Sequence, residues 1–259
     1  MSGSRLDEAT SRRSISQFAE LLKVQGKLAL REPYALLGGL ALPAVLVAVF
    51  GFIGQANPGN VGDSGLTIID LWTPTILVIS LMIIAVSLPN TLVRDREIGW
   101  LRRVSTTPLH PSRLLAAQLV IDLILAAVAV LMVILEGALL FGASLHVQIL
   151  PFAVSLLFSI VELFTLGLVL VALVPTQTVS QPVAGVVTFS LMFLSGLWVN
   201  PAQVGDPLRT IMYYSPSGAA VKAVLDSAFN GSPSYAALLT MAVYTVIFGF
   251  IAIRFFRWE

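Results

Sequence analysis

The sequence predicts an all-α integral membrane protein with six transmembrane helices, and three observations lead to this prediction. Charged residues make up 11% of the 259 residues and hydrophobic residues 57%, which leaves too little polar surface for a soluble globule. Six apolar runs have about the 20 residues that a helix needs to cross a hydrocarbon core of roughly 30 Å. These runs are continuously apolar, whereas the strands of a membrane barrel alternate.

We expect a single transmembrane domain that includes the whole chain, residues 1–259. Its spans are predicted, in order, at residues 34–54, 69–91, 114–141, 149–173, 179–199 and 235–256. Prolines fall inside several of these runs: Pro43, Pro74, Pro89 and Pro182. Neighbouring helices or water can satisfy the carbonyl groups that a proline frees, so these residues predict kinks rather than interruptions.

The basic residues are unevenly distributed between the two sides of the predicted membrane. Thirteen lie before the first span, between the second and third spans, or after the sixth span. The segments on the other side contain two, Arg209 and Lys222. Short cytoplasmic segments are typically rich in lysine and arginine. The sequence therefore predicts a multi-pass protein with both termini and the loop at 94–112 in the cytoplasm.

Residues 14–31 are predicted to form an amphipathic helix in the membrane interface. Its apolar residues share one helical face: Ile15, Phe18, Leu21, Leu22 and Leu28. Its basic residues recur on another face: Lys23, Lys27 and Arg31. Such a helix places its apolar stripe at the acyl boundary and its cations among anionic head groups. A helix exposed to the cytoplasm is the alternative.

The loop at 94–112 is predicted to contain a short helix that docks a soluble partner. Orientation in the membrane explains its arginines but not its pattern. Leu101 and Val104 provide an apolar face, Gly99 permits a sharp turn, and Pro108 stops the helix before the third span. A short helix that joins two spans and is apolar on one side has the form of a docking element.

The segment at 200–234 is predicted to form an outer hairpin of two short helices. Apolar residues share one face in each half: Val204, Leu208, Ile211 and Met212, followed by Val221, Val224, Leu225 and Phe229. Two helices that re-enter the membrane part way would bury both stripes. A hairpin on the surface is the alternative, and the sequence leaves both open.

Three acidic residues lie inside predicted spans. Asp122 is near the cytoplasmic end of the third span, Glu136 lies beyond its middle, and Glu162 is close to the middle of the fourth. An ionised carboxylate costs at least about 2.5 kcal/mol at such depth, so each must be protonated, paired or in contact with water. We interpret Asp122 as structural. Glu136 and Glu162 are candidates for the substrate path, with a structural role as the alternative for each.

The sequence contains no constellation that indicates catalysis, a metal site or a cofactor. It has no cysteine, and its two histidines, His110 and His146, are predicted to lie on opposite sides of the membrane. No phosphate-binding Gly-x-x-x-x-Gly-Lys-Ser/Thr motif is present. The arginines of the loop are explained by orientation, so they do not indicate a nucleic-acid partner. We therefore expect a protein that is not an enzyme.

Several stretches resemble the type-2 ABC exporter permeases, especially small bacterial drug and antibiotic-resistance exporters. After the second span these proteins have an acidic-Arg-Glu-x-Gly-x-Leu motif followed by Thr-Pro, which here reads "DREIGWL" at 95–101 and "TP" at 107–108. The first span, "REPYALLGGLALPAVLVAVFG" at 31–51, is also similar. So is "SGLWVNPAQVGDPLRTIMYYSPSGAAVKAV" at 195–224, and together these similarities extend over nearly the whole chain.

The resemblance implies the membrane part of an efflux transporter in the bacterial cytoplasmic (inner) membrane. Two six-span subunits, either identical copies or paralogues, would stand on two copies of an ABC ATPase that binds ATP and Mg. The coupling helix that meets the ATPase would use Asp95, Arg96, Glu97, Gly99, Trp100, Leu101 and Pro108. The expected cargo is a small amphipathic molecule, such as a drug, antibiotic or lipid-like compound, exported by alternating access.

Three other functions fit part of the sequence. A proton- or ion-coupled secondary transporter would explain Glu136 and Glu162, although such carriers often have related halves and no internal similarity is evident here. An exporter of polysaccharides or lipid-linked glycans would share the resemblance. A membrane scaffold or immunity protein would explain the spans without a pathway.

Overall fold

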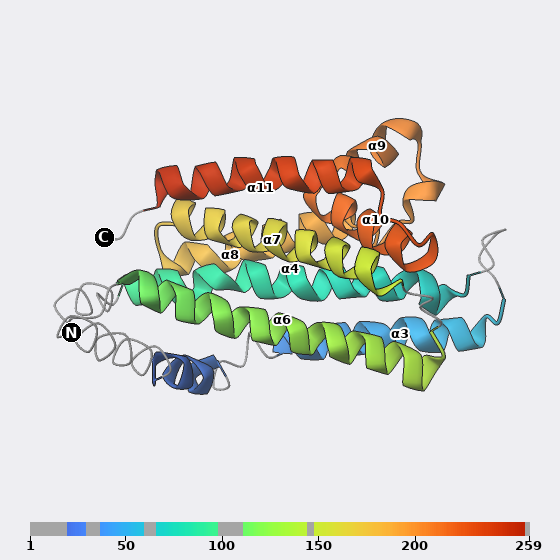
Figure 1. Cartoon of the computed structure of the whole chain (residues 1–259), viewed down its shortest axis with the longest axis horizontal. Helices are drawn as coiled ribbons and strands as arrows, with labels where there is room; N and C mark the ends of the chain where they lie inside the picture. Colours follow the sequence, from blue (N-terminus) through green and yellow to red (C-terminus); the bar gives the residue numbers. More distant parts are fainter. Residues whose placement is uncertain (1–19, 30–36, 60–65, 98–110, 144–147, 257–259) are drawn as a thin grey trace, which may run out of the picture.

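The computed structural model describes residues 20–29, 37–59, 66–97, 111–143 and 148–256. Throughout these ranges the regular structure is helical (Figure 1). Six helices are long and apolar enough to cross a membrane. The predicted all-α fold with six spanning helices is therefore confirmed.

The longer helices lie side by side (Figure 1). In chain order the elements are a π-helical turn η1 (Leu37–Ala41), α3 (Leu42–Ala56), α4 (Ile68–Glu97), α6 (Pro111–Phe141), α7 (Ile149–Leu173), α8 (Gln177–Leu194), a 3-10 turn η3 (Pro201–Gln203), α9 (Asp206–Tyr214), α10 (Pro216–Phe229) and α11 (Tyr235–Phe255). The end of α4, the start of α6 and the end of α11 lie at one end of the bundle, which we call the charged end. The short helices α9 and α10 lie at the other, the hairpin end.

The helix ends that differ most from the sequence prediction are those of the fifth and second spans. The fifth span ends at Leu194 rather than near residue 199, because Ser195 and Gly196 turn the chain and Gly196 has a φ of +88°. Glycine adopts this left-handed conformation without a steric penalty. The second span continues as a helix to Glu97. Residues 94–97, which the sequence predicts as part of the loop at 94–112, are thus the last turn of α4, and residues 111 and 112 of that loop belong to α6.

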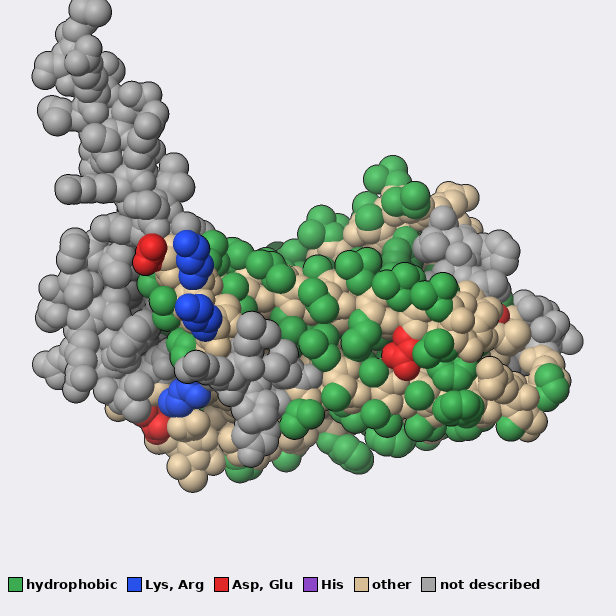
Figure 2. Space-filling view, turned by 90° about the horizontal axis from the view of Figure 1, so that it is seen from below, with side chains coloured by type: hydrophobic (Ala, Val, Ile, Leu, Met, Phe, Trp, Pro, Cys, Tyr) green, Lys and Arg blue, Asp and Glu red, His purple; other side chains and the backbone are tan. Residues whose placement is uncertain are grey.

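Helix α4 forms the centre of the bundle. It packs against α3, α6, α7, α8 and α10. In its most apolar window 82% of the residues are buried, compared with 17% in both α8 and α11. The outer helices therefore present apolar side chains outward, as a lipid-facing surface requires, and Figure 2 shows hydrophobic side chains over much of the flank between the two ends.

A proline and a glycine bring α4 and α7 close together. Pro89 has no N–H, so the carbonyl of Ala85 loses its usual helical partner. Gly167 of α7 lies against that carbonyl, and a Cβ atom on Gly167 would be 2.2 Å from the Ala85 oxygen. Small residues permit such close approach of helices in membranes, where packing contributes much of the association. The proline in α4 is thus matched by a small residue on the neighbouring helix.

The hairpin α9–α10 is folded tightly against the bundle. The Ser215 hydroxyl donates to the Met212 carbonyl at 2.7 Å and accepts from the Gly218 N–H at 3.0 Å, which caps α10. A Cβ atom on Gly218 would be 1.8 Å from the Met212 oxygen. Helix α10 packs against α4, α7 and α11. The two predicted short helices are present, but α9 leaves Leu208 and Ile211 exposed and buries Met212.

Part of the predicted interfacial helix is described, at residues 20–29. A Cβ atom on Gly26 would be 3.6 Å from the Ile121 side chain of α6, so this helix packs beside α6. Leu28 is 45% exposed and Val24 50% exposed, and Lys27 is exposed as well. The predicted stripe is therefore divided, because Leu28 points away from the bundle.

Candidate functional site

The predicted coupling motif begins in the last turn of α4, at the charged end. Figure 2 shows lysine and arginine side chains gathered at one end of the face it displays. Arg96 is half-buried and Glu97 is exposed. Asp95 belongs to the same turn. The other predicted coupling residues, Gly99, Trp100, Leu101 and Pro108, lie outside the described residues.

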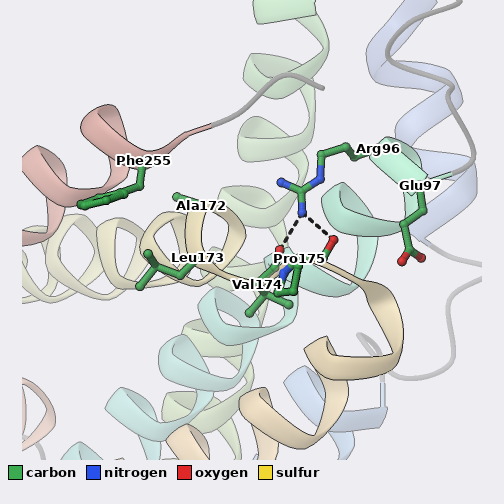
Figure 3. A pocket seen from close by; sticks show the side chains of 7 residues that line it. All are labelled: Arg96, Glu97, Ala172, Leu173, Val174, Pro175 and Phe255. Carbon is green, nitrogen blue, oxygen red and sulfur yellow. Dashed lines mark hydrogen bonds between the residues drawn. The ribbon is translucent and has the colours of Figure 1, made fainter.

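Arg96 joins α4 to the turn between α7 and α8. Its Nη2 atom donates to the Val174 carbonyl at 2.6 Å and to the Pro175 carbonyl at 3.0 Å (Figure 3). Helix α7 ends at Leu173, and Val174 is extended. The last carbonyl groups of a helix lack helical partners and attract cations. The guanidinium group supplies a charged donor that a short turn without basic residues cannot provide for itself.

A cavity of about 580 Å³ lies beside this contact. We call this cavity the charged-end cleft. It is lined by Arg96, Glu97, Ala172, Leu173, Val174, Pro175 and Phe255. Figure 3 shows the Arg96 side chain directed to the turn and the Glu97 side chain directed away from it. Three spans, α4, α7 and α11, thus contribute to one surface.

Glu162 is fully buried near the middle of α7. Neither of its carboxylate oxygens has a hydrogen-bond partner in the part of the chain that the structure describes. Ser155 and Ser159 are also buried on this helix, and the Ser159 hydroxyl donates to the Ser155 carbonyl at 2.8 Å. A buried polar group without a partner is costly. The carboxyl group is therefore a candidate for a contact that forms only in another state.

Glu136 lies in a different environment. It is half-exposed on α6, and α6 packs against α3 and α4, whereas α7 packs against α4, α10 and α11. Glu136 and Glu162 therefore lie on two different helices that both pack against α4. The two predicted path residues thus lie on helices that are not among the strongly packed pairs of the described bundle.

Asp122 has the surroundings of a structural residue. It is 5% exposed, and the Gln118 amide donates to both of its carboxylate oxygens, at 3.2 and 3.0 Å. These contacts support the structural interpretation. Among the described residues, no group of three or more histidine, cysteine, aspartate or glutamate side chains is placed to hold a metal ion. His110 and His146 lie outside those residues.

Sequence reasoning missed the turn at Val174 and Pro175 as a partner of Arg96. The two parts of this contact are 78 and 79 residues apart in the sequence. A signal was nevertheless available, because Pro175 ends a helix at a turn that has no basic residue of its own. Such a turn indicates that another segment satisfies its carbonyl groups.

The chain is similar to known proteins over much of its length. Residues 16–229 match the model of the family described as "ABC-2 type transporter". The chain is also 28% identical over 174 residues to a transport permease, ycf38, of Cyanophora paradoxa. That similarity covers 64% of this chain and 58% of the relative. The chain thus spans somewhat more than half the length of that relative.

Proposed function

Because the chain belongs to the ABC-2 type transporter family, we propose that it is the transmembrane permease subunit of an ATP-driven exporter. The family consists of membrane transport subunits rather than enzymes, and the chain is a multi-pass membrane protein. In the proposed assembly two copies of an ABC ATPase bind ATP and Mg. A second permease subunit, identical or paralogous, completes the pathway within the lipid.

The observation that carries this proposal is the contact of Arg96 with the turn at Val174 and Pro175. The motif that the resemblance assigns to coupling is attached through this arginine to a turn between two other spans. Glu97, the next residue, is exposed. A partner that moves Glu97 and the loop after it would displace the end of α4 and, through Arg96, the ends of α7 and α8.

The proposed mechanism is alternating access. Closure of the ATPase subunits on ATP would push the loop that follows Glu97, and the central helix α4 would transmit the movement because it packs against five other helices. Direction requires that the ATP-bound partner has different affinities for the two conformations. The pathway would open outward at the hairpin end, where α9 and α10 would act as a re-entrant hairpin.

The proposed cargo is a small amphipathic molecule, such as a drug, antibiotic or lipid-like compound. Apolar side chains dominate the bundle, and Glu162 provides a buried carboxyl group that would ionise when a cationic substrate pairs with it. Glu136 would face lipid or the second permease subunit. The proposed location is the bacterial cytoplasmic membrane, with both termini in the cytoplasm, as the predicted charge distribution favours.

Purification of the tagged chain from its own host in mild detergent tests the assembly. We expect mass spectrometry to identify a stoichiometric soluble protein with a phosphate-binding loop. Replacement of Glu97 and Gly99 by alanine is expected to remove this partner. Glu20→Ala, at another exposed glutamate, is the matched control and should retain it. Recovery of this chain alone, even after crosslinking in native membranes, would contradict the proposal.

The unpartnered carboxyl group of Glu162 favours one second candidate, a proton- or ion-coupled transporter. Transport by membrane vesicles separates the two functions. The exporter requires ATP and continues when the proton gradient is collapsed, whereas the coupled carrier stops at collapse and ignores ATP. The range of compounds transported in the same vesicles would distinguish a small amphipathic cargo from a glycan.

A further inference from the structure

The hairpin end contains a pocket that the proposed function does not use. Its volume is about 860 Å³, within the range of roughly 300–1,000 Å³ that is typical of small-molecule sites. Residues of α3, α4, α9, α10 and the segment after α8 form its lining. We call it the hairpin pocket. It lies at the opposite end of the bundle from the charged-end cleft.

Aromatic rings form much of the pocket wall. Phe50 of α3 and Trp72 of α4 are stacked, with their centroids 4.3 Å apart. Trp198 and Tyr213 also line the pocket, and Trp198 is 56% exposed. Tryptophan and tyrosine favour the boundary between acyl chains and water. Such a wall suits an apolar chain whose polar end remains at that boundary.

The shape of the pocket depends on backbone conformation as well as on side-chain positions. Gly196, which lines it, has a φ of +88°, and a Cβ atom there would be 2.9 Å from Pro201. Gly218 also lines it and permits the close contact between α10 and the end of α9. The tight turns at Gly196 and Gly218 therefore place α9, α10 and the segment after α8 opposite α3 and α4, which completes the pocket wall.

The charged edge of the pocket consists of Lys222 and Asp226. The Lys222 Nζ is 3.3 Å from an Asp226 carboxylate oxygen and 5.1 Å from the centroid of the Tyr213 ring. The other Asp226 oxygen accepts from the Asn230 amide at 3.3 Å. Both carboxylate oxygens thus have partners, while a lysine ammonium has three N–H donors. Lys222 can bind a negatively charged group without leaving Asp226.

We propose that the hairpin pocket binds an amphiphile with an apolar chain and a negatively charged carboxylate or phosphate head group. The chain lies against Phe50 and Trp72, and the head group accepts a hydrogen bond from Lys222. The position of the pocket at the end of the spans places the head group near water and the chain toward the bundle. This proposal is independent of the proposed export function, because equilibrium binding requires neither an ATPase nor transport.

Tryptophan quenching tests the proposal on the full chain in nanodiscs of neutral phospholipid. Phenylalanine replaces Trp100 and Trp258, so that the two tryptophans of the pocket wall, Trp72 and Trp198, are the reporters. Dibromostearate, whose bromines quench indole at short range, is the probe. We expect saturable quenching that unbrominated stearate reverses. Absence of saturation would overturn the proposal, because bromine in the surrounding bilayer quenches without reaching a limit.

Charge variants test the head-group contact. A charged hydrogen bond supports an expected loss of affinity of about tenfold or more for Lys222→Gln, with Lys222→Arg retaining most of the affinity. The matched control, Lys27→Gln, is expected to leave binding unchanged. The methyl ester of dibromostearate should bind as weakly to the parent protein as the acid does to Lys222→Gln. Equal affinities of acid and ester, or no effect of Lys222→Gln, would overturn the proposal.

A competition experiment separates the two sources of such a head group. If phosphatidylglycerol in the nanodisc displaces dibromostearate more effectively than phosphatidylcholine, and this difference is lost in Lys222→Gln, an anionic membrane lipid is the occupant. If both phospholipids fail to compete while binding still depends on Lys222, the occupant is a single-chain amphiphile. Both results support the proposed chemistry. Equal displacement by both phospholipids would show that the site ignores charge and would overturn it.

Discussion

The two ends of α4 meet their neighbours by different physical means. At the charged end one side chain, Arg96, makes two directed hydrogen bonds to the backbone of a distant turn. At the hairpin end Trp72 stacks on Phe50 and lines a pocket. Hydrogen bonds lose strength steeply when their geometry changes, whereas apolar contact is non-directional. The first arrangement suits transmission of a displacement, and the second suits ligands of variable shape.

The largest expected effect on stability comes from the close contact between α4 and α7, which lies between the two ends of α4. Gly167→Val places a side chain where a Cβ atom is already 2.2 Å from the Ala85 carbonyl, so we expect a loss of about 3 kcal/mol or more. Thermal unfolding in detergent measures it. Gly249→Val is the control, because a Cβ atom there meets no atom within 4 Å. Equal stability of the two variants would mean that the close contact between Gly167 and Ala85 does not stabilise the packing of α4 on α7.

A smaller effect is expected when only the hairpin end is disturbed. In Gly218→Ala the new Cβ atom would be 1.8 Å from the Met212 carbonyl, and we expect a loss of about 2 kcal/mol. The fluorescence of the two pocket tryptophans should change because the pocket opens, while the assembly with the ATPase should persist. Gly185→Ala, at an open position, should alter neither property. If the Gly218→Ala variant no longer binds the ATPase, the hairpin end and the charged end do not behave independently.

The reverse experiment disturbs only the charged end. Arg96→Ala removes two charged hydrogen bonds, which are worth about 1.5–3 kcal/mol each before the turn relaxes and binds water, so we expect a net loss of about 1.5 kcal/mol. ATP hydrolysis by the assembled complex should no longer respond to transported compounds, and the fluorescence of the two pocket tryptophans should remain unchanged. Arg254→Ala, at an exposed arginine, is the control. A response equal to that of the parent would exclude Arg96 from coupling.

The smallest expected effect on stability comes from replacing Glu162, the buried acid near the middle of α7. Glu162→Gln preserves shape and removes the ability to ionise. The free energy of unfolding should change by less than about 1 kcal/mol, because a carboxyl group buried without a partner is already neutral and no described hydrogen bond to it is lost. Transport of cationic compounds should fall about tenfold, the equivalent of about 1.4 kcal/mol, with neutral compounds unaffected. Vesicle uptake measures both. Failure of the variant to assemble would indicate a structural residue.

The sequence was sufficient for the arrangement of the spans but not for the contacts between them. Six apolar runs determine six helices because the membrane requires internally satisfied backbone groups. The end of α8 at Leu194 was not predicted, since the apolar run continues through Leu197 and Trp198 while the backbone turns at Gly196. An apolar run shows which side chains can lie in the membrane, but it does not show where the backbone turns. Here the helix ends inside the apolar run because Gly196 adopts a left-handed conformation.

The candidate site was predictable in part for a similar reason. The motif residues stand out in the sequence, but their partners do not, because Arg96 binds backbone carbonyl groups and any residue type can supply those. Glu136 and Glu162 look equivalent as acids in apolar runs. Their difference in burial arises from tertiary packing, since α6 lies at the edge of the bundle and α7 packs against three other helices.

The contact of Arg96 also has a consequence for biogenesis. Arg96 precedes Val174 by 78 residues, so it leaves the ribosome well before the turn that it binds. The turn between α7 and α8 has no positive charge of its own to retain it on the side of synthesis, and charge retention is the usual topological signal. We expect an earlier part of the chain to lend that signal, so that the newly inserted fourth and fifth spans are oriented by an arginine that was already in place.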